Sequence, residues 1–191
     1  MKKYIALLLV FVLVISLCGC GGSNGDVTDA GNDVSSEAPL TTVDISNYAT
    51  IGRFPELNVG IGGIMGDVRV QYAGNPSLSY SSVTGIHILS CDSTTYYMTV
   101  GDYKVVAVMT NKEVFGLKNT TTPDKLAAFL GEPVTAGVPN ITKIDPYGNV
   151  SGDKWSQTYT MGENTLVFYY LSGKLYGTLL YKTGAFALVG E

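Results

Sequence analysis

Apolar residues in the last two thirds of the chain fall into short runs separated by polar turn residues. These runs are rich in Val, Thr and Tyr, a composition that favours strands over long helices. The strands expected from this pattern are 85–90, 94–100, 103–110, 113–118, 141–145, 154–161, 164–171, 174–181 and 185–189. The segment 46–60 is a candidate for a further edge strand. The run 166–171 is apolar at consecutive positions, which predicts a strand buried on both faces.

Two short helices are expected, one ahead of each group of strands, at 64–73 and 122–130. The second has clear boundaries. Thr122 is a suitable N-cap and Pro123 fits the first helical position. At the other end, Gly131 supplies a left-handed cap and Pro133 prevents continuation. Hairpin turns are expected at 101–102, 111–112, 162–163 and 172–173, where Gly, Asn and Ser cluster.

The helix-ending stretch FLGEP at 129–133 has a counterpart, YAGNP, at 72–76, which indicates an internal repeat. Farther along, residues 101–116 resemble residues 162–177, with the same order of turn, apolar run, polar turn and second apolar run. The spacing between the two matches grows from 57 to 61 residues, which places about four extra residues in the loop 137–153. We therefore predict two tandem units, at 46–120 and 121–191.

The first residues have the pattern of an export signal. Lys2 and Lys3 precede an apolar run that is too short for a comfortable membrane span. The run ends in Leu-Cys-Gly-Cys, which resembles the bacterial lipobox, and the fit is better for Cys20 than for Cys18. This resemblance implies a signal peptide at 1–19, lipidation of Cys20, and a protein anchored in the membrane on the extracytoplasmic side of a bacterial cell envelope. An ordinary signal with two incidental cysteines is the alternative.

Residues 20–45 are predicted to be a disordered, acidic tether. The stretch 21–45 is rich in Gly, Ser, Asn and Asp, and it holds five acidic and no basic residues. A flexible tether of this length reaches ~25–30 Å. The remaining body, 46–191, is nearly balanced, with 10 basic and 11 acidic residues. The absence of a basic stripe argues against nucleic acid as a partner.

The repeated order of helix, Gly-x-Pro stop and Tyr-rich hairpin resembles the β-lactamase-inhibitor-protein-like fold, and it is similar to SmpA/OmlA-type small lipoproteins. The resemblance covers about 60–191, and its main pieces are Leu126 with 129–133, and 166–177. It implies an α+β fold of two helix-plus-antiparallel-sheet units, with the helices on one face and the sheets forming a joint concave surface. It also implies that aromatic residues on the concave surface hold a protein partner.

Residues that could carry chemistry are few. His87 and Cys91 are four apart, so they would share one face of a strand. A Cys/His hydrolase needs a third group to orient the base, and no residue marks one. His87, Cys91 and Asp92 are too few for a metal site at this spacing. We therefore expect no enzyme activity, no metal and no cofactor, and keep the hydrolase as the least favoured alternative.

The aromatic residues are the remaining candidates for function. For any single one of them, a place in the sheet core with cross-strand pairing is the more common role, and the alternative is an anchor for a partner. The residues predicted to bind a partner are Tyr103, Trp155, Tyr159, Tyr169 and Tyr176. The favoured hypothesis is a non-enzymatic module that binds a protein or peptide. The alternative is a module for cell-wall glycan or a small ligand, with Trp155 and neighbouring tyrosines at its site.

Overall fold

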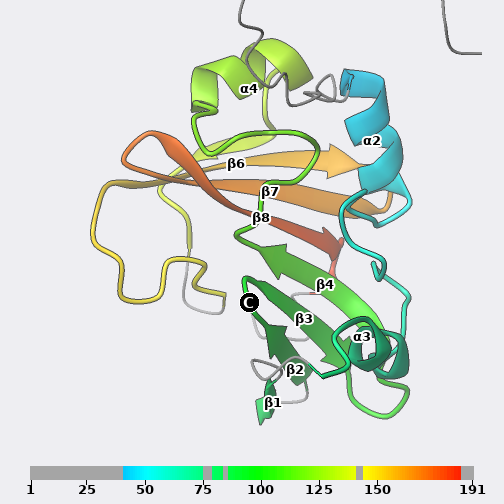
Figure 1. Ribbon diagram of the computed structural model, residues 1–191. Helices are drawn as coiled ribbons and strands as arrows, with labels where there is room; N and C mark the ends of the chain where they lie inside the picture. Colours follow the sequence, from blue (N-terminus) through cyan, green and yellow to red (C-terminus); the bar gives the residue numbers. More distant parts are fainter. Residues whose placement is uncertain (1–40, 75–78, 84–85, 141–143, 186–191) are drawn as a thin grey trace, which may run out of the picture. The chain divides into compact units, whose positions relative to one another are not determined.

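An antiparallel sheet of eight strands forms the centre of the fold (Figure 1). The computed structural model describes residues 41–74, 79–83, 86–140 and 144–185, which lie within one compact unit, 37–191. The described helices are α2 (Thr42–Thr50), α3 (Met65–Gln71) and α4 (Pro123–Leu130). The strands are β1 (Ser79–Val83), β2 (Ile86–Cys91), β3 (Thr94–Thr99), β4 (Val105–Thr110), β5 (Thr135–Gly137), β6 (Lys154–Met161), β7 (Asn164–Leu171) and β8 (Lys174–Lys182). The predicted α+β class is confirmed, as are both predicted helices.

The strand order across the sheet is β1-β2-β3-β4-β8-β7-β6-β5. Each run of four consecutive strands therefore forms a meander, and β4 and β8 join the two meanders at the centre. Their pairing sets Val108 opposite Leu180 and Thr110 opposite Thr178. One helix precedes each meander in the chain, α3 before β1 and α4 before β5.

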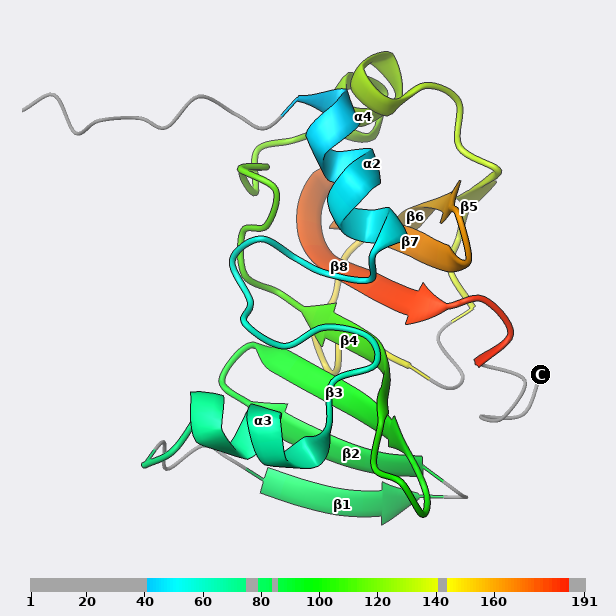
Figure 2. The same cartoon turned by 90° about the vertical axis from the view of Figure 1, so that its right-hand side faces the viewer.

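The described helices all pack on one face of the sheet. Figure 2 shows α3 over the β1–β4 half, and α2 and α4 over the β5–β8 half. Buried residues of the three helices, including Ile45, Val68 and Leu126, share one core with Tyr96, Phe168 and other strand residues. The opposite face, called here the helix-free face, carries a second cluster that includes Met109, Val167, Tyr169 and Leu179. Strand β7 is buried from Asn164 to Tyr170, as its apolar run predicted.

Helix α4 is held on the sheet by a buried polar chain. The Tyr170 hydroxyl donates to Gln157 Oε1 at 2.8 Å, and Gln157 Nε2 donates to the carbonyl oxygen of Pro123 at 3.1 Å. The predicted start of the helix is also present, since the Thr122 side chain accepts from the backbone nitrogen of Lys125. The helix ends at Gly131, whose φ of 90° favours glycine.

Helix α2 corrects two predictions. Residues 42–45 were assigned to the flexible tether, and 46–60 to a candidate edge strand. The structure instead has a helix at Thr42–Thr50, followed by a coil that buries Phe54 and Leu57. Its start is a capping box, in which Thr41 and Asp44 exchange side-chain to backbone hydrogen bonds. The signal peptide, Cys20 and the tether up to residue 40 lie outside the described residues.

The strand predicted at 113–118 is wrong. Val114 and Leu117 bridge a tight turn, and Phe115 and Gly116 have φ of 58° and 65°. A strand requires negative φ, so the chain cannot extend there. Phe115 is instead buried against Phe54, with ring centroids 5.2 Å apart. The matched segment 174–181 does form a strand, β8.

Two further predicted strands, 141–145 and 185–189, lie only partly within the described residues. Ile144 and Asp145, the described part of the strand predicted at 141–145, are not in a strand. Ala185 is likewise not in a strand, and the rest of 185–189 lies outside the described residues. Within the described parts of the chain, no helix is both long and apolar enough to cross a membrane.

Candidate binding site on the helix-free face

The connection from β5 to β6 lies across the helix-free face. Its Tyr147 is buried, and its hydroxyl donates to the carbonyl oxygens of Tyr170 at 2.8 Å and Trp155 at 3.0 Å. The Tyr147 ring stacks on Tyr176, with centroids 5.3 Å apart, and meets Tyr169 edge-on at 6.0 Å. These contacts fix the connection on the sheet near β7 and β8, because a buried hydroxyl needs its partners.

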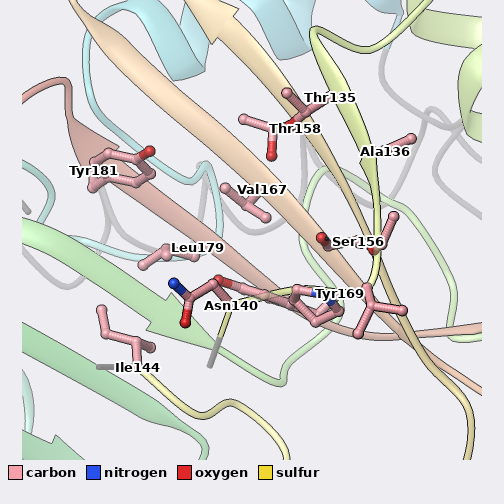
Figure 3. Close-up of a pocket in the computed structure, with 13 residues that line it drawn as sticks. Thr135, Ala136, Asn140, Ile144, Ser156, Thr158, Val167, Tyr169, Leu179 and Tyr181 are labelled. Atoms are coloured by element: carbon pink, nitrogen blue, oxygen red, sulfur yellow. Dashed lines mark hydrogen bonds between the residues drawn. The ribbon is translucent and has the colours of Figure 1, made fainter. Parts of the chain in front are cut away.

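A cavity of about 620 Å³ lies between this connection and strands β5 to β8. Figure 3 shows Asn140 and Ile144 of the connection on one side, with Val167 and Leu179 of the sheet beneath. The volume lies within the range of small-molecule sites, ~300–1,000 Å³. Strand β5, the last strand of the sheet, forms the rim.

Hydroxyl groups of Ser and Thr side chains from two strands, β5 and β6, line the cavity. Ser156 and Thr158 face it from β6, because alternate residues of a strand point to the same face. Thr135 is opposite Thr158 in the pairing of β5 with β6, so it adds a third hydroxyl at the same level. The Ser156 hydroxyl donates to the carbonyl oxygen of Gly137 at 3.3 Å.

Apolar and aromatic groups form the remainder of the wall. Val167 and Leu179 are cross-strand partners in β7 and β8, and Tyr169 and Tyr181 flank them. Burial raises the pKa of Tyr169, so its hydroxyl is protonated at neutral pH. None of the described lining residues carries a formal charge.

A second cavity, of about 660 Å³, lies beyond Tyr176 at the turns that end β2 and β7. Asp92 and Lys174 are among its lining residues, together with Asn111. Asn111 is engaged within the fold, since its side chain donates to the carbonyl oxygen of Tyr176 at 3.0 Å.

The five tyrosine and tryptophan residues predicted to bind a partner do not form one surface. Tyr169 lines the cavity, and Tyr176 lies beside Tyr147 on the same face. Tyr159 is only 4% exposed and belongs to the helix-side core, so it is not offered to a partner in this structure. Trp155 is 41% exposed, but strand alternation from Gln157 places it on the helix side.

Tyr103, the fifth predicted residue, lies at the β3–β4 turn, away from the cavity. It is 40% exposed, and its ring stacks on His87 with centroids 4.6 Å apart. Its φ of 53° and the hydrogen bond from the Met65 nitrogen to its carbonyl oxygen tie this turn to the start of α3.

His87 and Cys91, the residues of the hydrolase alternative, are both buried in strand β2. Burial raises the pKa of the Cys91 thiol, and the neighbouring Asp92 carboxylate raises it further. A raised pKa lowers the thiolate fraction, and the thiolate is the nucleophile. Among the described residues, no group of three or more His, Cys, Asp and Glu could hold a metal ion.

Five polar lining residues were missing from the predicted site: Thr135, Asn140, Ser156, Thr158 and Tyr181. The sequence holds one signal for two of them. In KWSQTYTM, small hydroxyl residues recur at every second position, which indicates a strand with one hydroxyl-rich face. Asn140 carries no such signal, because it reaches the cavity only through the path of the β5–β6 connection.

No protein-family model matches the sequence, and no curated protein matches it. Among solved structures, a DUF4309 family protein, YjgB, from Bacillus subtilis subsp. subtilis str. 168 is similar, with a TM-score of 0.53 and 16% identity. The match covers 74% of this chain and 95% of YjgB. An extracellular protein with an SCP domain from Bacillus anthracis str. Ames matches with a TM-score of 0.45 and 9% identity, over 84% of this chain and 52% of that one. At such identities the YjgB match shows a shared fold alone.

Proposed function

We propose that this protein is a lipid-anchored, non-enzymatic binding module on the extracytoplasmic side of a bacterial cell envelope, and that its ligand occupies the helix-free face of the sheet. The cavity bounded by β5 and the β5–β6 connection is the observation that carries the proposal. The Leu-Cys-Gly-Cys motif supports the location, and lipidation of Cys20 would supply the anchor.

The proposal includes two tandem units of one helix and four strands each. The order of elements supports it, since α3 with β1–β4 and α4 with β5–β8 follow the same plan and meet at β4 and β8. In a joint surface of this kind, the helix-free faces of both meanders are available to a partner. We also propose that this chain is related to β-lactamase-inhibitor-like proteins.

A protein or peptide is the first candidate ligand. Strand β5 ends the sheet and borders the cavity, and an extended segment can add to such an edge while its side chains enter neighbouring pockets. Val138, which follows β5 and lines the cavity, is 81% exposed. A segment added to the edge of β5 would cover this side chain.

Affinity capture from native envelopes tests this function. Cross-linked complexes would be recovered with the wild-type chain and with Thr158→Trp, which fills the cavity. Thr160→Trp is the matched control, because Thr160 is exposed on the same strand but does not line the cavity. We expect a specific ligand with the wild type and Thr160→Trp that is lost with Thr158→Trp. Equal recovery with all three chains, or none with the wild type, would contradict the proposal.

A glycan or small ligand is the second candidate. The specific observation in its favour is the hydroxyl-bearing lining of the cavity, in which none of the described residues is charged. Such a lining suits a ligand that exchanges many neutral hydrogen bonds.

A further inference from the structure

We infer that the cavity on the helix-free face binds a neutral saccharide. This inference rests on the proposed function, because it names the chemistry of the ligand for the same site. It follows from the charge, the hydrogen-bonding groups and the apolar floor of the cavity, taken in turn.

The described lining contains no Asp, Glu, Lys, Arg or His side chain. Moving an ion out of water into a site without a counter-charge costs far more than a neutral hydrogen bond returns. A phosphate, a carboxylate or an ammonium group therefore gains no counter-charge from these described residues.

The polar side chains of the lining favour a ligand that carries hydroxyl groups. Thr135, Ser156 and Thr158 present side chains that both donate and accept, and they come from two paired strands, β5 and β6. A hydroxyl rotates to suit its partner, whereas a peptide group has a fixed donor and a fixed acceptor. Several adjacent hydroxyls therefore match a ligand whose own groups are hydroxyls. Ser156 already donates to Gly137, so its oxygen remains an acceptor.

The apolar floor of the cavity suits the C–H face of a sugar ring. Val167 and Leu179 form an apolar patch, and the rings of Tyr169 and Tyr181 flank it (Figure 3). A pyranose ring has a face of C–H groups and a rim of hydroxyls, so its face packs on apolar or aromatic side chains while its rim exchanges hydrogen bonds. The cavity thus presents an apolar floor from β7 and β8 beside a hydroxyl-bearing side from β5 and β6.

Isothermal titration of the full-length chain in detergent tests the inference, with chitotetraose and cellotetraose as neutral saccharide probes. We expect at least one probe to bind. Thr158→Val removes a hydroxyl at nearly constant shape, so binding should weaken by roughly tenfold. Thr160→Val is the matched control, since Thr160 lies outside the cavity, and its affinity should stay within about twofold of the wild type.

Two results would overturn the inference. One is the absence of binding by both probes. The other is binding that Thr158→Val leaves unchanged, which would locate the saccharide elsewhere. If the probes fail while envelope capture still yields a peptide or protein that Thr158→Trp abolishes, the saccharide inference falls and the proposed binding face stands. If both experiments fail, the proposed function falls as well.

Discussion

The side-chain nitrogen of Asn164 lies 2.9 Å from the carbonyl oxygen of Ala49, a residue 115 positions earlier in the chain. The same nitrogen donates to the carbonyl oxygen of Thr50, also at 2.9 Å. These carbonyl groups belong to the last turn of α2, where the helix itself provides no donors. Asn164 therefore caps the helix from the β6–β7 hairpin and fixes α2 on the sheet.

Replacing Asn164 with alanine should lower the free energy of unfolding by about 1–2 kcal/mol, because the carbonyl groups of Ala49 and Thr50 lose the Asn164 donor. The Ala49 carbonyl keeps a second donor, the backbone nitrogen of Gly52. Urea denaturation followed by circular dichroism measures the change. Asn47→Ala is the matched control, since Asn47 is exposed on α2, and its effect should remain within about 0.5 kcal/mol. An Asn164→Ala variant as stable as the wild type would show that the contact does not hold the helix.

The free energy of unfolding should fall at high pH, because Tyr147 loses its proton more readily in the unfolded chain. Burial raises the pKa of Tyr147 to about 12, whereas a tyrosine of the unfolded chain titrates near 10. The unfolded state thus loses its proton first as pH rises. The stabilisation is complete below about pH 10 and is lost as pH approaches 12. The phenolate also cannot donate to the carbonyl oxygens of Trp155 and Tyr170.

Denaturation curves at pH 9 and pH 11.5 check this for the wild type and Tyr147→Phe. The variant lacks the titrating hydroxyl, so its loss of stability over this interval should be smaller, by ~1–2 kcal/mol after allowance for solvent screening. Equal losses in both proteins would mean that Tyr147 keeps its ordinary pKa in the folded state.

Cys91 should be protected from thiol reagents in the folded protein. It is fully buried, and its pKa is raised by burial. In a Cys18→Ser/Cys20→Ser variant, where Cys91 is the one remaining cysteine, iodoacetamide should react at least ~10-fold more slowly in buffer than in denaturant. A reaction of equal speed in both conditions would reveal an accessible thiol and strengthen the hydrolase alternative.

Lipidation should depend on Cys20 and not on Cys18. Cells fed a radioactive fatty acid should label the wild type and Cys18→Ala, whereas Cys20→Ala should carry no label. The physical reason is that acyl chains attach to the cysteine that follows the cleavage site, and the motif places cleavage before Cys20. Label retained by Cys20→Ala would contradict lipidation at Cys20.

Local signals in the sequence are sufficient to predict α4 and three of the four expected hairpin turns. Thr122, Pro123 and Gly131 act through their own backbone and nearest neighbours, so their positions do not depend on the rest of the fold. The start of α2 does not stand out from the polar composition of 21–45, although Thr41 and Asp44 match a capping box. The apolar character of Phe115 suits a buried strand and also the turn that buries it, so the sequence alone does not separate the two.

The candidate site was much harder to predict than the elements that form it. The hydroxyls of β6 follow from strand alternation, but the pairing of β4 with β8 and the path of the β5–β6 connection are long-range. Aromatic residues were a poor guide for the same reason. Tyr159 and Tyr169 look alike in sequence, and only their strand parity separates the helix-side core from the cavity.

Site-specific photo-cross-linking in living cells can show whether the ligand lies on the helix-free face. A benzophenone amino acid would replace Val138 at the cavity and, as the matched control, Val100 at the β3–β4 turn, since both valines are exposed, by 81% and 56%. We expect a discrete adduct on irradiation from position 138 and none from position 100. An adduct from position 100 alone, or none from position 138, would contradict this placement of the ligand.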